Sequence, residues 1–233
     1  MPLFVITGAS QGMGRAIAEI FSGEENVQLA LIARNEANLK EVAVVCEAQG
    51  AEVAIYPCDV TDEKGVADVA TRVIEQWGAP DVLINNAGVF QPGGFLETTL
   101  ESFKYQLDVN LTSAFMVTQG FLQSMIDKGA GTLFYMASVA SLKAYPGGAA
   151  YCTAKHGLLG LARSVREETR DKGLRVTTLL PGATLTPSWD GVDIPEERFM
   201  PATDIAKAVR DIYHMSDRTV VEEVVLRPQL GDI

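Results

Sequence analysis

The sequence has few cysteines and few histidines, and this scarcity excludes two kinds of stabilisation. There are 3 cysteines and 2 histidines among 233 residues. Cys46, Cys58 and Cys152 are odd in number and far apart, and no CxxC pair occurs. Neither His156 nor His214 has a cysteine at ligand spacing. We therefore expect no disulfide framework and no metal site.

Positive charge is also scarce. Lys and Arg number 19 against 30 Asp and Glu, which leaves a net charge of -11. Such an acidic surface repels phosphate backbones and anionic lipid, so we expect neither nucleic acid nor a membrane as partner. A small-molecule anion can still bind in a local pocket.

Long apolar runs are missing as well, since no stretch reaches the roughly 18 residues of a membrane-spanning helix. The N-terminal MPLFVITG has no basic region ahead of its apolar residues, unlike a secretory signal. No repeat, linker or low-complexity segment divides the chain. We therefore expect one domain spanning 1–233, in a cytoplasmic protein.

What the sequence does contain is an alternation of apolar, β-branched runs with segments of helical spacing. Strands are predicted at 3–7, 27–33, 52–57, 81–86, 131–138, 174–180 and 222–226. Helices are predicted at 13–24, 35–49, 62–77, 99–127, 150–171 and 203–215. The strands are nearly continuous apolar runs, which is typical of a sheet covered on both faces. The pattern predicts an α/β fold, a Rossmann-type doubly wound three-layer sandwich with a seven-stranded parallel sheet.

One long segment has no clear periodicity. Residues 181–202, PGATLTPSWDGVDIPEERFMPA, contain 4 prolines. A loop of this length in a compact domain is usually functional, so we expect a substrate-binding loop rather than a merely ordered surface excursion.

A glycine-rich turn follows the first predicted strand. In VITGASQGMGRAIAE, Gly8, Gly12 and Gly14 lie between that strand and the start of a helix. Glycines here let backbone N–H groups approach a pyrophosphate, and the helix N-terminus adds free donors and a favourable dipole. The context predicts a dinucleotide-binding loop, with the spacing GxxxGxG rather than GxGxxG.

A tyrosine and a lysine are four residues apart in YCTAKHG. Residues i and i+4 share a helix face, so Tyr151 and Lys155 should point into the same space. A free tyrosine has a pKa of about 10. A cation within about 4–6 Å lowers such a pKa by roughly 1–3 units. We expect Lys155 to lower the pKa of Tyr151, which would then act as general acid or base, while Ser138 at a strand end stabilises the substrate oxygen.

Seven motifs stand in order along the chain: TGASQGMG (7–14), CDV (58–60), NNAG (85–88), Asn110, Ser138, YCTAK (151–155) and PGATLT (181–186). Together they resemble the short-chain dehydrogenase/reductase family in its compact single-domain form, over nearly the whole chain. The resemblance implies reversible hydride transfer between a nicotinamide cofactor and a carbonyl. It also implies four catalytic residues, Asn110, Ser138, Tyr151 and Lys155.

The resemblance further implies roles for single positions. Lys155 would bond the nicotinamide ribose, Asn110 would anchor a water that links this lysine to solvent, and Asp59 would contact the adenine amino group. The positions expected to contact the cofactor are Thr7, Gly8, Ser10, Gln11, Gly12, Met13, Gly14, Arg34, Asn35, Asp59, Val60, Asn86, Ala87, Gly88, Tyr151, Lys155, Pro181, Gly182, Thr184 and Thr186.

The end of the second strand predicts which cofactor is used. NAD-selective Rossmann domains have an acidic residue here that accepts a hydrogen bond from the ribose 2′-OH. This chain has Ala33 and then Arg34, whose guanidinium can bind a 2′-phosphate. We therefore expect NADP(H). Gln11 stands where many NADP-preferring relatives have a basic residue.

The substrate is less determined. Phe90, Tyr145 and Trp189, with the 181–202 loop, could form an aromatic pocket for a flat ketone, or could be ordinary packing residues. The expected substrate contacts are Ser138, Tyr145, Tyr151 and Trp189. The segments RTVVEEVVLRPQLGDI and PGATLTPSWDGVD are similar to bacterial sepiapterin reductase-like members of the family. That similarity implies a pterin with a side-chain ketone, bound by Asp190 or Asp232.

Two other functions remain open from the sequence. One is a 3-oxoacyl-(acyl-carrier-protein) reductase, although an acidic carrier suits a chain of net charge -11 poorly. The other is a catalytically idle NADP-binding regulator, which would be expected to lack Tyr151, Lys155 or Ser138. The family pairs two long helices between subunits, so the segments 99–127 and 150–171 imply a homodimer or homotetramer.

Overall fold

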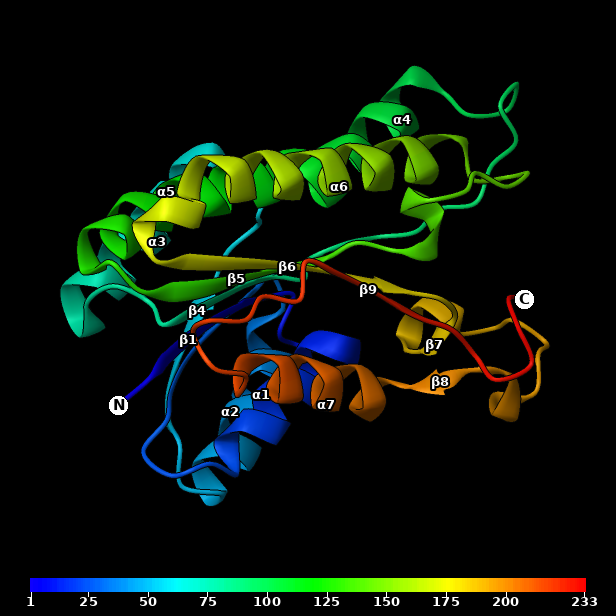
Figure 1. Ribbon diagram of the computed structural model, residues 1–233. Helices are drawn as coiled ribbons and strands as arrows, with labels where there is room; N and C mark the ends of the chain where they lie inside the picture. Colours follow the sequence, from blue (N-terminus) through cyan, green and yellow to red (C-terminus); the bar gives the residue numbers. More distant parts are fainter.

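A parallel sheet forms the centre of the protein, which is described over residues 1–233 by a computed structural model (Figure 1). Its strands are β1 (Leu3–Thr7), β2 (Gln28–Ala33), β3 (Glu52–Pro57), β4 (Val82–Asn85), β5 (Gly131–Met136), β6 (Leu174–Pro181) and β9 (Glu223–Leu226). The spatial order is β3-β2-β1-β4-β5-β6-β9, and every neighbouring pair is parallel. The predicted seven-stranded Rossmann-type sheet is therefore confirmed.

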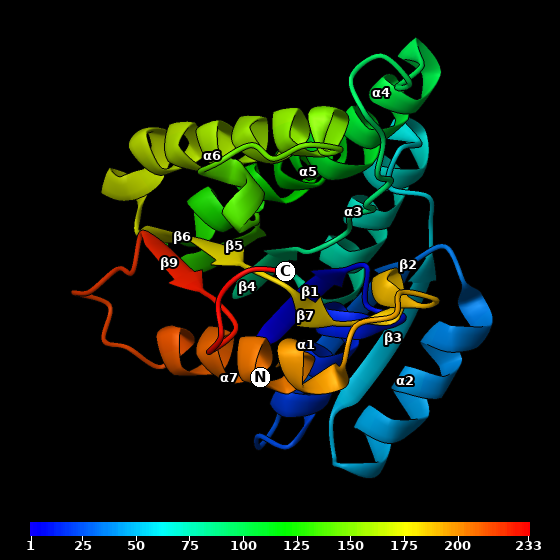
Figure 2. The ribbon, with the colours of Figure 1, turned by 90° about the vertical axis from the view of Figure 1, so that its right-hand side faces the viewer.

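Helices cover both faces of this sheet (Figures 1 and 2). On one face lie α1 (Gly12–Ser22), α2 (Glu36–Ala48) and α7 (Ala202–Tyr213). On the other lie α3 (Glu63–Trp77), α5 (Ser113–Lys128) and α6 (Ala149–Thr169), with α4 (Leu100–Leu107) leading into α5. Each face has its own cluster of buried apolar side chains, one of 25 residues and one of 24. Strands that must fill two such clusters have little room for polar residues, which explains their unbroken apolar runs.

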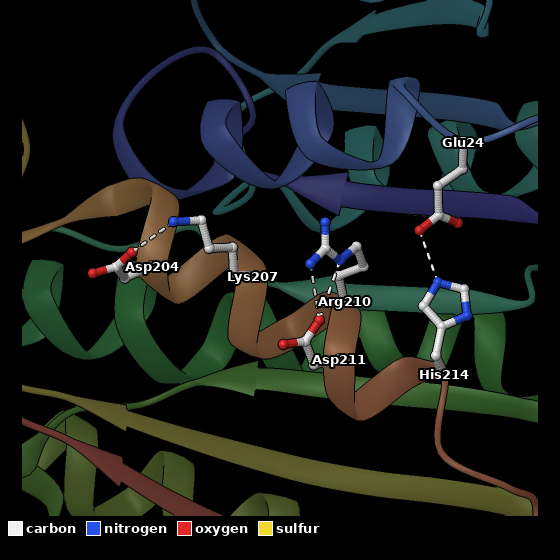
Figure 3. A network of polar contacts seen from close by, with 6 residues as sticks. All are labelled: Glu24, Asp204, Lys207, Arg210, Asp211 and His214. Atoms are coloured by element: carbon white, nitrogen blue, oxygen red, sulfur yellow. Dashed lines mark hydrogen bonds and ion pairs between the residues drawn. The ribbon is translucent and has the colours of Figure 1, made fainter.

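Helix α7 packs along α1 on one face of the sheet. The rings of Phe4, Phe21 and Tyr213 meet between them, with centroids 4.2 to 5.8 Å apart. At the far end His214 Nε2 lies 2.7 Å from Glu24 Oε1 and joins the ends of the two helices (Figure 3). The other ion pairs drawn in Figure 3 are local pairs on the exposed side of α7 and contribute little to stability.

The helix predicted over 99–127 is confirmed, with one irregularity that the sequence did not predict. A π-helical turn, Asp108–Thr112, separates α4 from α5. The reason is the buried amide of Asn110, whose Nδ2 donates to the Gln106 carbonyl at 2.9 Å and to the Val89 carbonyl at 2.9 Å. A side chain that takes a helix carbonyl and reaches a neighbouring segment inserts into the i→i−4 ladder and widens the turn.

The 181–202 segment is more ordered than a plain loop. β7 (Thr184–Leu185) pairs with β8 (Met200–Pro201), so its two ends are joined as a small separate sheet. Two 3₁₀ turns, Pro187–Trp189 and Glu196–Arg198, lie between them. None of the helices in the structure combines the length and the apolar character needed to cross a bilayer.

Candidate functional site

Two adjoining cavities open at the carboxyl edge of the sheet, where the strand order reverses between β1 and β4. The larger has a volume of about 620 Å³ and the smaller about 390 Å³. The residues that border both are Met13, Asn86, Gly88, Val89, Thr186 and Ser188. The two cavities therefore form one continuous groove, in the position where open α/β sheets bind ligands.

The glycine turn between β1 and α1 is built for close backbone approach. Gly8 and Gly12 have φ angles of +65° and +56°, in the left-handed region that side chains disfavour. A Cβ on Gly14 would lie 2.3 Å from the Gly8 carbonyl oxygen, so the turn closes only with glycine there. Helix α1 begins without a side-chain cap and has no acidic residue in its first turn. Its free N–H groups and positive end fit the phosphates of a dinucleotide.

Thr7 and Asn86 hold this turn against the end of β4. The Thr7 hydroxyl donates to the Ile84 carbonyl at 3.2 Å and accepts from the backbone N–H of Asn86 and of Ala87 at 2.9 and 3.1 Å. Thr7 lines neither cavity, and its contacts are those of a support for the turn. Asn86 Nδ2 donates to the Thr7 and Gly8 carbonyls, while its Oδ1 is buried without a partner at the groove.

The smaller cavity collects most of the residues predicted to bind the cofactor. It is lined by Gly8, Ser10, Gln11, Gly12, Met13, Arg34, Asn35, Asp59, Val60, Asn86, Ala87, Gly88 and Thr186. Arg34 is exposed, with Nη1 3.8 Å from Asp59 Oδ2. Burial favours the neutral acid, but hydrogen bonds from Thr61 and the Arg34 charge outweigh it and lower the pKa of Asp59. Asn35 also caps α2 by accepting from the Asn38 N–H at 3.1 Å.

The larger cavity brings the four predicted catalytic residues together, with Pro181, Gly182 and Thr184 beside them. The Ser138 hydroxyl follows β5, accepts from the Ala140 N–H at 3.1 Å and donates to the Pro181 carbonyl at 3.4 Å. Lys155 is 4% exposed, and its Nζ donates to the Met136 carbonyl at 2.9 Å. The same Nζ lies 5.6 Å from the centre of the Tyr151 ring. Helical spacing on α6 thus places both groups in one cavity.

The expected lowering of the Tyr151 pKa is contradicted. Burial raises the pKa of Tyr151 to about 12, against a smaller lowering by the Ser138 hydrogen bond. Burial also lowers the pKa of Lys155 to about 8. The physical reason is that desolvation disfavours both charged forms, while the lysine Nζ is directed at a carbonyl rather than at the phenol oxygen. The sequence indicated that Tyr151 and Lys155 lie together, but it did not indicate how completely both side chains are buried.

Asn110 and Lys155 converge on Gly88. A Cβ at Gly88 would lie 2.8 Å from Asn110 Oδ1 and 3.5 Å from Lys155 Nζ. The Asn110 amide also brackets the backbone of Val89, accepting from its N–H at 3.2 Å and donating to its carbonyl at 2.9 Å. Glycine at position 88 is therefore required by close approach rather than by its backbone angles.

The predicted substrate residues Tyr145 and Trp189 both line the larger cavity. The ring of Trp189 packs on Phe199 from the same 181–202 segment, with centroids 5.0 Å apart. Asp190 borders neither cavity, so its suggested contact with substrate has no structural basis. Asp232 does line the larger cavity and is ion-paired with Arg227.

Sequence reasoning missed Arg227 and Lys143, which border the larger cavity. It also missed the Met136 carbonyl that accepts from Lys155. A turn returns the C-terminal segment to the cavity: the Gly231 N–H donates to the Pro228 carbonyl at 2.9 Å. PQLG, at 228–231, is a recognisable turn sequence. Nothing in the neighbouring residues indicates, however, that this turn lies beside the larger cavity.

A doubly wound parallel sheet with a glycine turn at its switch point, and a Ser–Tyr–Lys group in the adjoining cavity, define an NAD(P)-binding oxidoreductase. Residues 3–196 match the short chain dehydrogenase family, and the chain belongs to that family. It is similar to a sepiapterin reductase of Chlorobaculum tepidum, at 37% identity over 99% of this chain and 98% of the relative.

Two solved structures are close to this fold. An alcohol dehydrogenase from the archaeon Thermococcus sibiricus, complexed with 5-hydroxy-NADP, is 31% identical and superposes with a TM-score of 0.93. The match covers 100% of this chain and 99% of that one. A metagenomic short-chain oxidoreductase in complex with NADP is also 31% identical, with a TM-score of 0.87 over 99% and 98% of the two chains.

Proposed function

We propose that this protein is an NADP(H)-dependent reductase that converts a ketone into a secondary alcohol. The observation that carries the proposal is the shared groove. The hydroxyls of Ser138 and Tyr151 and the amine of Lys155 lie in a cavity continuous with the one that the glycine turn lines. Such an arrangement lets one carbonyl group meet a hydride donor on one side and a proton donor on the other.

The chain's own groups divide the work between them. NADPH, when bound along the glycine turn, supplies the hydride. Tyr151 Oη holds the proton that goes to the substrate oxygen, and Ser138 Oγ donates a hydrogen bond to that oxygen as negative charge develops. The ammonium of Lys155 lies beside the ring and stabilises the phenolate that remains after proton transfer. Asn110 fixes the backbone of Val89 beside this group.

Arg34 favours NADP(H) over NAD(H). Its exposed guanidinium lines the smaller cavity directly after Ala33, which stands where an acidic residue would accept from a ribose 2′-OH. A guanidinium binds a 2′-phosphate through charge-assisted hydrogen bonds. The two solved relatives are complexed with 5-hydroxy-NADP and with NADP, which agrees with this assignment.

The lining of the larger cavity favours a flat substrate that bears a ketone on a side chain. Phe90, Tyr145, Tyr151 and Trp189 present aromatic surface there, on which a planar ring can stack. Asp232 is the only Asp or Glu side chain among the lining residues and can accept from ring N–H groups. A pterin of the sepiapterin type meets both requirements, and the C. tepidum relative supports that choice.

A substrate panel with two variants tests the proposal. NADPH oxidation is followed in the presence of sepiapterin, a phenyl-substituted diketone, 2,3-butanedione and acetoacetyl thioesters. Tyr151→Phe should remove most of kcat and leave NADPH affinity nearly unchanged, whereas Lys155→Ala should impair both. Wild-type kcat in Tyr151→Phe would refute the assigned acid. Tight NADPH binding without turnover of any ketone would indicate a regulator, and preference for the thioester would indicate an acyl-carrier reductase.

The helices α4, α5 and α6 form an exposed layer that suits pairing between copies of the chain. Phe115 on α5 is 48% exposed, and Leu100 at the start of α4 is 68% exposed. A homodimer or homotetramer would cover them. Light scattering of the purified protein distinguishes these states, and a monomer at micromolar concentration would rule out both.

A further inference from the structure

Phe90 is the closest aromatic neighbour of the residue assigned as proton donor. Its ring lies edge-on to that of Tyr151, with centroids 5.1 Å apart and an interplanar angle of 72°. This geometry is the preferred one for an aromatic pair. A phenol ring without such a neighbour can tilt about its side-chain torsions, so the contact restrains the orientation of the Tyr151 ring.

The backbone on both sides of Phe90 is clamped by two buried amides. Asn110 brackets Val89 through two hydrogen bonds, as described above. Gln106 does the same to Gln91: its Oε1 accepts from the Gln91 N–H at 3.3 Å, and its Nε2 donates to the Gln91 carbonyl at 3.1 Å. The side chains of Gln106 and Asn110 therefore hold the residues immediately before and after Phe90.

These two amides act as one rigid unit. They are four residues apart, and Asn110 Nδ2 also donates to the Gln106 carbonyl at 2.9 Å. Gln106 is 2% exposed and Asn110 is 1% exposed, so water cannot replace either clamp cheaply. Gln106 lines neither cavity and has no part in the proposed chemistry. The burial of the Gln106 amide against the backbone of Gln91 therefore has to be explained by a role other than contact with substrate or cofactor.

We propose that Phe90 and Gln106 are positioning residues: Gln106 fixes the 89–91 backbone so that the Phe90 ring holds Tyr151 in its proton-donating orientation. The inference rests on the proposed function, because it requires Tyr151 to be the acid. The proposal predicts that a substitution at Phe90 or Gln106 lowers kcat even when no contact with the substrate is removed. Gln106 is the sharper case, since no substrate in the groove can touch it.

A double-mutant cycle on kcat tests the link. The variants are Phe90→Leu, Gln106→Met and their combination, assayed with 2,3-butanedione, a substrate too small to depend on an aromatic wall. The interaction free energy of an aromatic pair corresponds to roughly a two- to tenfold change in rate. We expect each single variant to lose kcat in that range, with KM changed less. The double variant should be no slower than the slower single, because both act through one contact.

Further measurements separate positioning from damage to the fold. Phe90→Tyr keeps the ring and should keep at least half of kcat. Hydrogen exchange at the Gln91 amide should accelerate in Gln106→Met and stay unchanged in Phe90→Leu. Matched controls are Phe95→Leu and Gln123→Met, which change an exposed ring and an exposed amide. Should Gln106→Met fail to fold, Gln106→Asn, which shortens the amide by one methylene, replaces it.

The outcomes are distinguishable. Wild-type kcat in Phe90→Leu overturns the proposal, as do single effects that multiply in the double variant. Losses shared by the two controls also overturn it. If Tyr151→Phe is inactive while Phe90→Leu is fully active, the positioning role alone fails. If Tyr151→Phe keeps its kcat, the proposed function itself fails.

Discussion

Gly88→Ala adds one methyl group at the point where Asn110 and Lys155 converge. The new Cβ would lie 2.8 Å from Asn110 Oδ1 and 3.5 Å from Lys155 Nζ. The first distance is about 0.6 Å short of ordinary van der Waals contact, so the amide must move. Asn110 Oδ1 already accepts from the Val89 N–H at 3.2 Å, and a shift of that size breaks the bond. A buried group left without its partner costs about 1–3 kcal/mol.

That cost predicts a measurable change in both stability and rate. For a chain of this size, 1 kcal/mol corresponds to roughly 2–4 °C in Tm, so Gly88→Ala should melt at least about 2 °C lower. Displacement of Lys155 or Asn110 by a fraction of an ångström should also reduce kcat about 10-fold or more. Gly160→Ala is the matched control, because nothing lies within 4 Å of a Cβ there. Helix propensity should make that variant slightly more stable. A Gly88→Ala protein with wild-type Tm and kcat would refute the convergence on Gly88.

Three further predictions concern charge. Arg34→Ala should weaken NADPH by roughly 1.5–3 kcal/mol, or about 10–100-fold, with NADH almost unaffected, as measured by fluorescence titration; equal losses would exclude a 2′-phosphate contact. Because burial lowers the pKa of Lys155 to about 8, its ammonium is lost as pH rises past that value. The pH profile of kcat/KM for ketone reduction should therefore fall above about pH 8, and in Lys155→Arg this descending limb should disappear. Asp232→Asn should raise KM for sepiapterin and not for 2,3-butanedione, and equal KM changes would count against an N–H contact.

The main features of the fold were accessible from the sequence because they depend on periodicity. Seven unbroken apolar runs separated by helical spacing permit few arrangements, and right-handed crossovers reduce these further. The Tyr151–Lys155 placement was equally accessible, since two residues four positions apart on a helix share a face. The glycine turn was recognisable from its context between strand and helix. Each of these inferences uses residues close together in the chain.

The missed features depend on contacts between distant segments. The π turn at Asp108–Thr112 exists because Asn110 reaches Val89, 21 residues earlier, and no local propensity indicates that reach. Arg227 enters the larger cavity because the C-terminal segment turns back across the end of β6, where Gly182 donates to the Leu226 carbonyl at 2.8 Å. The role of Gln106 likewise appears only once Gln91 is placed beside it. The spacing of residues along the chain does not predict such contacts between distant segments.

The prediction from the sequence and the structure also differ in the direction of the pKa shift of Tyr151. A lysine one turn away suggested an acidified phenol, yet burial acts on both groups and favours their neutral forms. Burial raises the pKa of Tyr151 to about 12, which favours the protonated phenol in the neutral range. Ketone reduction starts from that protonated form, whereas alcohol oxidation needs the phenolate. Each pKa unit above the working pH makes the phenolate tenfold rarer. Under the proposed reductase function the protonated phenol is the form that donates, and the charge on Lys155 stabilises the phenolate once the proton has left.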